Sequence, residues 1–358
     1  MLSPIDLSSD RFEAISPAHV REAAKSALDA GETHYTTRPG LIPLRQAIAE
    51  RHAKATEVTV DPLHQVLVTC GEEEALFVAI HTLVGPGDEV LVVGPSPASD
   101  ATLVARAGGA IRHLAWPTMA SDPGTWLQGS LSERTRVALL RNPSLEGAVL
   151  ESPMAQALLL EADAHNATVI SVESLADFSR GGRRPQGFAA VPGAGSRTLT
   201  IGGFSAWGLD GWRVGYMIGP TTLVAPMTNL KQALSICSPA LGQYAALAAA
   251  TGPQDHLTDL CADLDERWDA VVAELNKSAI PVTVAEAGYH LFVPVTGRAV
   301  QKVDEIWDAV SVRVAPGDEG GVAGSVRINL SPPAPVLADA ARRMAPLLAG
   351  VGGGARSG

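Results

Sequence analysis

Four carboxylates stand beside predicted strand ends, where side chains of different elements meet. Glu72 and Glu73 follow Gly71 at the start of a predicted helix, and Glu173 directly follows an apolar run. Asp100 lies in the segment after another apolar run. Carboxyl groups transfer protons well when burial and neighbouring charges tune their pKa values. We therefore take these four residues as candidate catalytic residues for acid–base chemistry.

The turn Gly71-Glu72-Glu73-Glu74 also bears on which ligand the helix start accepts. A glycine turn at a helix N-terminus binds phosphate through its free N–H groups. A carboxylate about 4 Å from a phosphate charge costs on the order of 4 kcal/mol at an effective dielectric of about 20. Acidic residues in a first helical turn also stabilise the helix itself, and this alternative stays open. The turn is therefore predicted to disfavour a phosphate dianion.

Alternating strands and helices must position these residues. Strands are predicted at residues 65–70, 88–93, 136–140, 167–172, 197–202 and 212–218. Near-continuous apolar strands separated by helices predict a mostly parallel sheet that is covered on both faces. Ligands of such sheets bind outside the carboxyl ends of the strands. The joints between strands and helices are therefore where a site is expected.

The pattern changes after residue 254 and predicts a smaller α+β domain. A helix is predicted over residues 259–277, strands near 282–286, 289–293 and 325–330, and a last helix from residue 334. We divide the chain into four parts: an N-terminal segment (1–40) that joins the small domain, a large domain (41–254), the small domain (255–350) and a disordered tail (351–358).

Composition excludes several classes of function. The 358 residues carry a net charge of 27 − 38 = −11, which argues against a nucleic-acid surface. No apolar run approaches the roughly 18 residues of a membrane span, and the N-terminus lacks an export signal. The three cysteines have no metal-ligand spacing. We expect a cytoplasmic protein with no metal site and no nucleic-acid or membrane partner.

Six sequence blocks follow one another along the chain: HYTTRPGLIPLRQAIAERH, VTCGEEEALFVAIHTLVGPGDEVLV, NPSLEGAVL, VISVESLADF, GLDGWRVGY and SVRINLS. Together they resemble the fold type I pyridoxal-phosphate-dependent aminotransferases of class I/II, over nearly the whole chain. The resemblance implies an α/β protein with a large domain, whose mostly parallel sheet is flanked by helices, and a smaller α+β domain. It also implies a homodimer. A fold alone does not determine the chemistry.

The resemblance implies a Schiff-base lysine eight residues before the arginine of the Gly-x-Arg-x-Gly run. That arginine is Arg213, and 213 − 8 = 205 gives Ser205. A hydroxyl cannot form an imine with an aldehyde. The nearest lysine downstream, Lys231, falls in a helical pattern and is expected at the surface. The sequence therefore predicts a degenerate member of the family without the Schiff-base lysine.

Other positions also depart from the family pattern. Val172 stands where the family's Asp holds the pyridinium nitrogen, and Leu175 stands where its Tyr bonds the ring oxygen. Gly202 replaces a phosphate-binding hydroxyl, and Pro97 replaces the stacking aromatic residue. From these departures we predict that the protein uses no cofactor and that pyridoxal phosphate is absent.

The resemblance also implies which residues bind a substrate. Arg327 aligns with the arginine that grips the substrate α-carboxylate through a planar fork, although an ion pair between domains is an alternative. Tyr35 matches a tyrosine that reaches into the neighbouring subunit's site. Ser205, Arg213 and Trp207 complete the candidate substrate-binding set. Arg213 could instead pair with Glu72 or Glu73, and Trp207 would offer a stacking face or simply pack in the core.

Three functions are compatible with the sequence. The first is an enzyme without pyridoxal phosphate, which acts by acid–base chemistry (cyclisation, condensation or elimination) on an amino-acid-derived carboxylate in bacterial specialised metabolism. The second is a non-catalytic homologue that binds an amino acid or has a regulatory role. The third is a true pyridoxal-phosphate-dependent aminotransferase with an altered site. The departures from the family pattern favour the first, and His290, on a predicted strand, is expected to be packed rather than catalytic.

Overall fold

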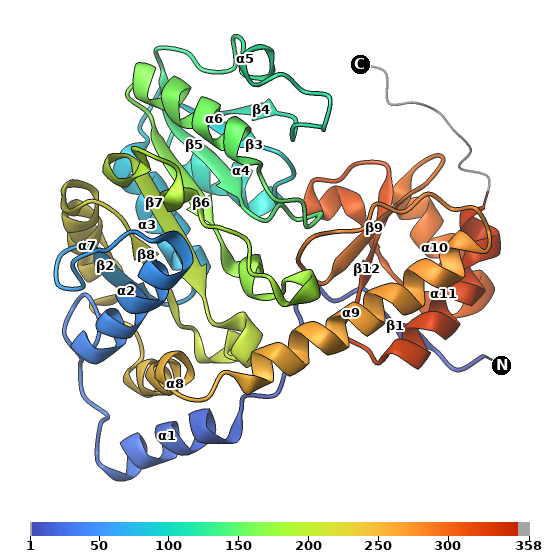
Figure 1. Ribbon diagram of the computed structural model, residues 1–358, viewed down its shortest axis with the longest axis horizontal. Coiled ribbons are helices and arrows are strands. Elements are labelled where there is room, and N and C mark those ends of the chain that lie inside the picture. Colours follow the sequence, from blue (N-terminus) through green and yellow to red (C-terminus); the bar gives the residue numbers. More distant parts are fainter. Residues whose placement is uncertain (1, 350–358) are drawn as a thin grey trace.

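A seven-stranded sheet forms the centre of the computed structural model, which describes residues 2–349 (Figure 1). The strand order is β2-β8-β7-β6-β5-β3-β4. The strands are β2 (Val66–Thr69), β3 (Glu89–Val93), β4 (Ala110–Leu114), β5 (Thr135–Arg141), β6 (Thr168–Val172), β7 (Thr198–Gly203) and β8 (Gly215–Ile218). β8 runs antiparallel to both of its neighbours, and the remaining pairings are parallel. The predicted α/β architecture with a mostly parallel sheet is confirmed.

Buried aliphatic side chains explain why these segments form strands. Every residue of β2, β3 and β6 is buried, as parallel strands require when helices cover both faces of a sheet. β4 differs, because its residues are exposed or half-buried and include Arg112 and His113. The sequence pattern did not predict β4 for this reason.

Helices cover both faces of the large sheet. One face packs against α3 (Glu72–Leu83), α4 (Ala98–Arg106) and α7 (Thr221–Ser235). The other packs against α6 (Ser152–Ala164) and the segment around the short α5 (Pro123–Trp126). A third apolar cluster includes residues of α2 (Ile42–Thr56) and α8 (Ala240–Thr251). Both faces of the sheet are thereby covered, so a site is expected at its strand ends.

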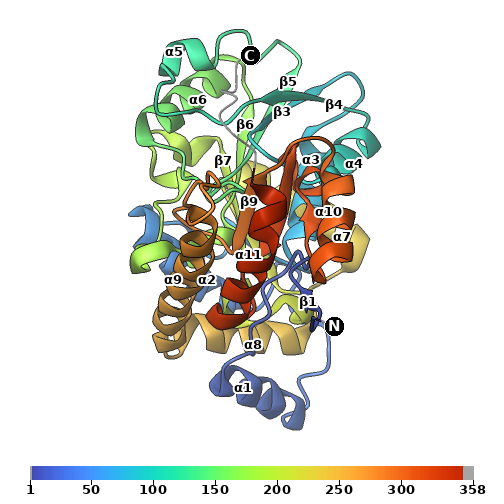
Figure 2. The ribbon, with the colours of Figure 1, turned by 90° about the vertical axis from the view of Figure 1, so that its right-hand side faces the viewer.

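A second, smaller part follows in the sequence and lies in front of the large sheet in Figure 2. Its sheet has the order β11-β12-β9, with antiparallel pairings. Its elements are α9 (Asp255–Asn276), β9 (His290–Pro294), α10 (Ala299–Val310), β10 (Val312–Arg313), β11 (Ala315–Pro316), β12 (Ser325–Asn329) and α11 (Ala334–Leu348). The strand predicted near residues 282–286 is absent, and only Ala287 pairs there, in an isolated bridge with Ser179.

The N-terminal residues contact both parts. β1 (Ile5–Asp6) pairs with β10, whereas α1 (Ala18–Asp29) packs against α8. The tail predicted to be disordered, residues 351–358, lies outside the described residues. Within residues 2–349, no helix has both the length and the apolar character to cross a membrane.

Candidate functional site

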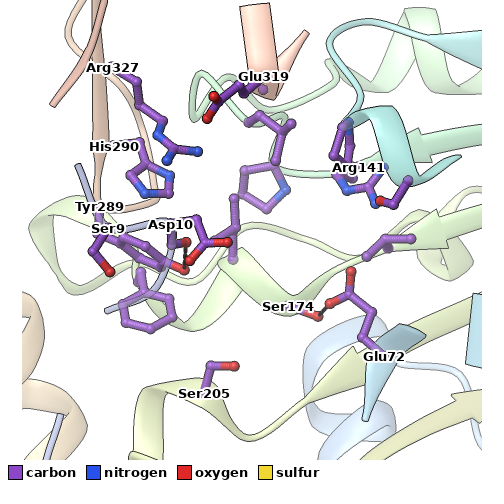
Figure 3. Close-up of a pocket in the computed structure, with 18 of the residues that line it drawn as sticks. Ser9, Asp10, Glu72, Arg141, Ser174, Ser205, Tyr289, His290, Glu319 and Arg327 are labelled. Carbon is purple, nitrogen blue, oxygen red and sulfur yellow. Dashed lines mark hydrogen bonds between the residues drawn. The ribbon is translucent and has the colours of Figure 1, made fainter. Parts of the chain in front are cut away.

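A cavity of about 570 Å³ lies between the large sheet and the second part of the chain (Figure 3). The large sheet contributes residues that follow its strands, including Glu72 after β2 and Ser205 after β7. The second part contributes His290 from β9 and Arg327 from β12. The cavity therefore lies at the carboxyl ends of parallel strands, where ligands of such sheets bind.

The start of α3 forms one wall of this cavity. The helix begins after Gly71, whose φ of 81° is a left-handed value that favours glycine. A side chain at Gly71 would also meet Arg213, whose Nη2 atom lies 2.6 Å from the position of a Cβ atom. Glu72 accepts a hydrogen bond from Ser174 Oγ, and Glu73 is exposed to the cavity. The structure thus brings the two predicted carboxylates together in one wall.

The environment of Glu73 makes its negative charge unfavourable. Although Glu73 reaches solvent in the cavity, the surrounding protein partly buries its carboxylate, and this raises its pKa; the neighbouring Glu72 carboxylate raises it further. Neither carboxylate forms an ion pair with a residue in the described part of the chain, where the nearby ion pairs join Arg141 to Asp100 and Lys231 to Glu74. The charges of Arg141 and Arg213 act in the opposite direction, but they do not offset burial and the Glu72 charge. The two carboxylates therefore favour a positively charged group at this wall.

Asp100 does not act as the free carboxylate that the sequence suggested. Its oxygens accept hydrogen bonds from the Arg141 guanidinium at 2.5 and 3.1 Å, and both side chains are buried. Arg141 lines the cavity, whereas Asp100 lies behind it. A carboxylate engaged in a bidentate ion pair behind the wall is not available to a ligand in the cavity. Asp100 is therefore the partner of Arg141 rather than a proton-transfer group.

The side chain of Glu173 is also not positioned to act as a general base in the cavity. It accepts hydrogen bonds from the Phe188 N–H at 2.8 Å and from Ser171 Oγ at 3.0 Å. It is buried and does not line the cavity. The sequence showed that it follows β6, but not that its side chain turns into the protein. The structure therefore gives Glu173 a packing and hydrogen-bonding role.

The burial of Glu173 predicts a pH dependence of stability. Burial raises the pKa of Glu173 in the folded protein, so the group favours folding when protonated, and this contribution is lost as the pH rises through the folded-state pKa. We expect Glu173→Gln to gain stability relative to the parent protein as the pH rises above about 4.3, the ordinary pKa of Glu. Thermal unfolding from mildly acidic to neutral pH measures this, with the exposed Glu133→Gln as control. A difference that is independent of pH would contradict the assignment.

Two further expectations are corrected by burial. Trp207 is fully buried, packs against Phe204 and lies under the Arg51 guanidinium, 4.4 Å from the ring centre. It is a core residue and offers no stacking face to the cavity. Lys231 is not at the surface, because it is completely buried, with Nζ 3.4 Å from Glu74 and 2.9 Å from Ser235 Oγ. The sequence alone did not show this ion pair, because Lys231 and Glu74 lie on different helices that are far apart in the chain.

The remaining candidates are separated by the structure. Ser205 lines the cavity and also a smaller one beside it, where Arg213 lies. Arg213 donates to the carbonyls of Asp210 and Cys70, at 3.2 and 3.4 Å. Tyr35 is 79% exposed and does not line the cavity of its own chain. Any contribution of Tyr35 to a binding site therefore requires a second chain.

Arg327 and His290 form the opposite wall (Figure 3). Arg327 is 8% exposed, donates from Nη2 to the Ser8 carbonyl at 3.0 Å, and leaves Nε without a partner among the described residues. His290 is 9% exposed, and its Nε2 is likewise unpartnered in that part of the chain. Burial and the Arg327 charge lower the pKa of His290 to about 3, so the ring is neutral at pH 7. The sequence analysis expected His290 to be packed and did not place it beside Arg327, because only the pairing of β9 with β12 brings the two together.

The protein thus has an α/β fold with a ligand cavity at the carboxyl ends of its strands. Comparison with known proteins identifies its family. The family model for aminotransferase class I and II matches residues 4–344, so the chain belongs to that family. It is 28% identical to the aspartate aminotransferase of Pyrococcus abyssi, over 93% of this chain and 88% of that protein. It is 31% identical to the arginine–pyruvate transaminase AruH of Pseudomonas aeruginosa, over 92% and 86%. The crystal structure of an aromatic aminotransferase from Pyrococcus horikoshii superimposes with a TM-score of 0.90 at 28% identity, covering 96% and 95% of the chains.

Membership of this family shows that the prediction of an enzyme without pyridoxal phosphate is wrong. Class I/II aminotransferases use this cofactor, and the relatives are aspartate and aromatic-amino-acid aminotransferases. The prediction that no cofactor is used is corrected for the same reason. Both rested on departures at individual positions, such as Ser205, Val172 and Leu175, whereas the relationship extends over most of the chain.

The side chains around the cavity nevertheless fit the cofactor poorly. Apolar Val172 and the hydroxyl of Ser205 face the cavity, and no lysine lines it or the smaller cavity within the described residues. Glu72 and Glu73 occupy the helix start that would hold a phosphate. We therefore derive no chemical step through pyridoxal phosphate.

Proposed function

We propose that this aminotransferase-family protein binds an amino acid, or the corresponding 2-oxo acid, in the cavity between its two parts. Arg327 holds the carboxylate of the ligand. The observation that carries the proposal is the buried guanidinium of Arg327, which lines the cavity, has no carboxylate partner among residues 2–349 and keeps a buried Nε atom without a hydrogen-bond partner there.

The cost of burying an unpaired charge supports this function. A buried guanidinium is costly unless an anion and hydrogen-bond acceptors compensate it. The Ser8 carbonyl satisfies one N–H group of Arg327, which leaves the charge itself without an anion. A carboxylate matches the planar fork of arginine and would supply both the charge and the acceptors.

Calorimetric titration tests the proposal. Amino acids and 2-oxo acids are titrated into the purified protein beside their amides, which lack the carboxylate charge. We expect binding of the acids and at least about tenfold weaker binding of the amides, because charge-assisted hydrogen bonds to Arg327 are lost. Equal binding of acids and amides would contradict a role for Arg327 in holding a carboxylate.

Family membership supports a second candidate, an aminotransferase with an altered site. The relatives carry aspartate, aromatic-amino-acid and arginine–pyruvate transaminase names. Incubation with pyridoxal phosphate, an amino acid and a 2-oxo acid tests it by mass spectrometry of the products. Formation of the exchanged amino acid would establish transamination. Binding without any exchange would leave the first function standing.

We also propose that the protein is a homodimer in which Tyr35 approaches the partner's cavity, and its location in the cytoplasm stays a prediction. Tyr35, Ile42 and Ile236 are large apolar side chains exposed on the single chain, and a subunit interface would cover such groups. We expect sedimentation at about micromolar concentration to give twice the chain mass. A monomer under these conditions would exclude a site shared between chains.

A further inference from the structure

We propose that Glu72 and Glu73 form a subsite for a cation, so that the ligand of the cavity is an amino acid with a positively charged side chain. This inference rests on the proposed function, because it describes the second end of the ligand whose carboxylate binds Arg327. Figure 3 shows Glu72 and Arg327 on opposite sides of the cavity. A ligand with a carboxylate at one end and a cation at the other therefore matches both walls.

The charges of the cavity wall favour such a ligand. In the described part of the chain, the charged lining residues are four carboxylates and two guanidinium groups: Asp10, Glu72, Glu73, Glu319, Arg141 and Arg327. Asp100 neutralises Arg141 from behind the wall. The wall is therefore negative overall, and a cavity lined by one sign of charge concentrates ligands of the opposite sign.

Glu72, Glu73 and Glu74 all lie in the first turn of α3, where acidic residues stabilise the helix, but only Glu72 and Glu73 also line the cavity. Glu74 Oε2 accepts a hydrogen bond from the Cys70 N–H at 2.6 Å, and Glu74 also pairs with buried Lys231. Glu74 therefore turns into the protein, where its charge is balanced. Glu72 and Glu73 turn to the cavity, where no positively charged side chain pairs with them in the described residues.

Two unpartnered groups on the opposite wall indicate independently that the cavity receives a polar ligand. Arg327 Nε and His290 Nε2 have no hydrogen-bond partner among residues 2–349, and both residues are more than nine-tenths buried and line this cavity. Buried polar atoms are normally satisfied, so a ligand at this wall would supply the missing partners. The raised pKa of Glu73 agrees, because a bound cation would relieve its repulsion by Glu72.

Matched ligand pairs test the inference on the unmodified protein. L-arginine is compared with the neutral L-citrulline, and L-lysine with the neutral L-norleucine, by calorimetric titration. We expect the charged member of at least one pair to bind about tenfold or more tightly, since the difference reports an ion pair in a partly desolvated site. If the neutral members bind as well as the charged ones, the cation subsite is refuted while the proposed function stands. If no amino acid or 2-oxo acid binds, the proposed function itself fails.

Variants then locate the subsite. In Glu72→Gln/Glu73→Gln we expect the preference for the charged ligand to fall to about one, while the neutral ligand keeps its affinity because Arg327 is intact. Glu319→Gln is the matched control, since it removes another carboxylate of the same cavity and should keep the preference. Loss of the preference in the control alone would move the cation to Glu319 and overturn the assignment. Thermal unfolding of each variant confirms that it is folded.

Discussion

Arg327→Ala is expected to weaken binding of the amino-acid ligand by about 2–5 kcal/mol, because the carboxylate loses its only uncompensated guanidinium in the described wall. Arg327→Lys should restore only part of this affinity, since a point charge cannot reproduce the two parallel hydrogen bonds of the fork. Calorimetric titration of both variants with the ligands that bind the parent protein measures the effect.

The control for this prediction is Arg342→Ala. Arg342 is exposed and pairs with acidic side chains of α9 and α11, away from the cavity. Its replacement should leave the affinity unchanged, because exposed ion pairs contribute little and this one does not touch the ligand. If Arg327→Ala binds as tightly as Arg342→Ala, the carboxylate lies elsewhere in the cavity.

Asp100→Asn is expected to destabilise the folded protein by about 3–5 kcal/mol, because it leaves the buried Arg141 guanidinium without its partner. The double variant Asp100→Leu/Arg141→Met should recover most of this loss, since a buried ion pair replaced by apolar side chains of similar size is often neutral. Chemical denaturation compares the two variants with the parent protein.

The partly exposed pair Arg136–Asp88 provides the matched control for this experiment. Its atoms Nε and Oδ1 lie 3.1 Å apart, yet both side chains reach solvent. Asp88→Asn should cost at most about 1 kcal/mol. An Asp100→Asn variant as stable as Asp88→Asn would show that Asp100 is not a buried partner of Arg141 and would return it to the candidate proton-transfer groups.

Local sequence patterns predicted the buried strands because each is a short, nearly continuous apolar run. β2, β3, β5 and β6 all appear where these runs lie, and every one is almost entirely buried. β4 escaped prediction because its residues are exposed or half-buried and do not form such a run. The segment 282–286 carried alternating apolar residues but found no strand to pair with. Strand pairing is a long-range property that a local pattern does not contain.

The sequence by itself determined the family, the sheet and the helix start that places Glu72 and Glu73 in the cavity, because these follow from ordered motifs and local periodicity. The tertiary structure alone decided which polar side chains reach the cavity. Asp100 and Glu173 follow strands much as Glu72 does, yet one is bound by Arg141 and the other is turned into the protein. The physical reason is that burial and ion pairing are set by neighbours distant in the chain, and these neighbours decide whether a carboxylate is structural or free to bind a ligand.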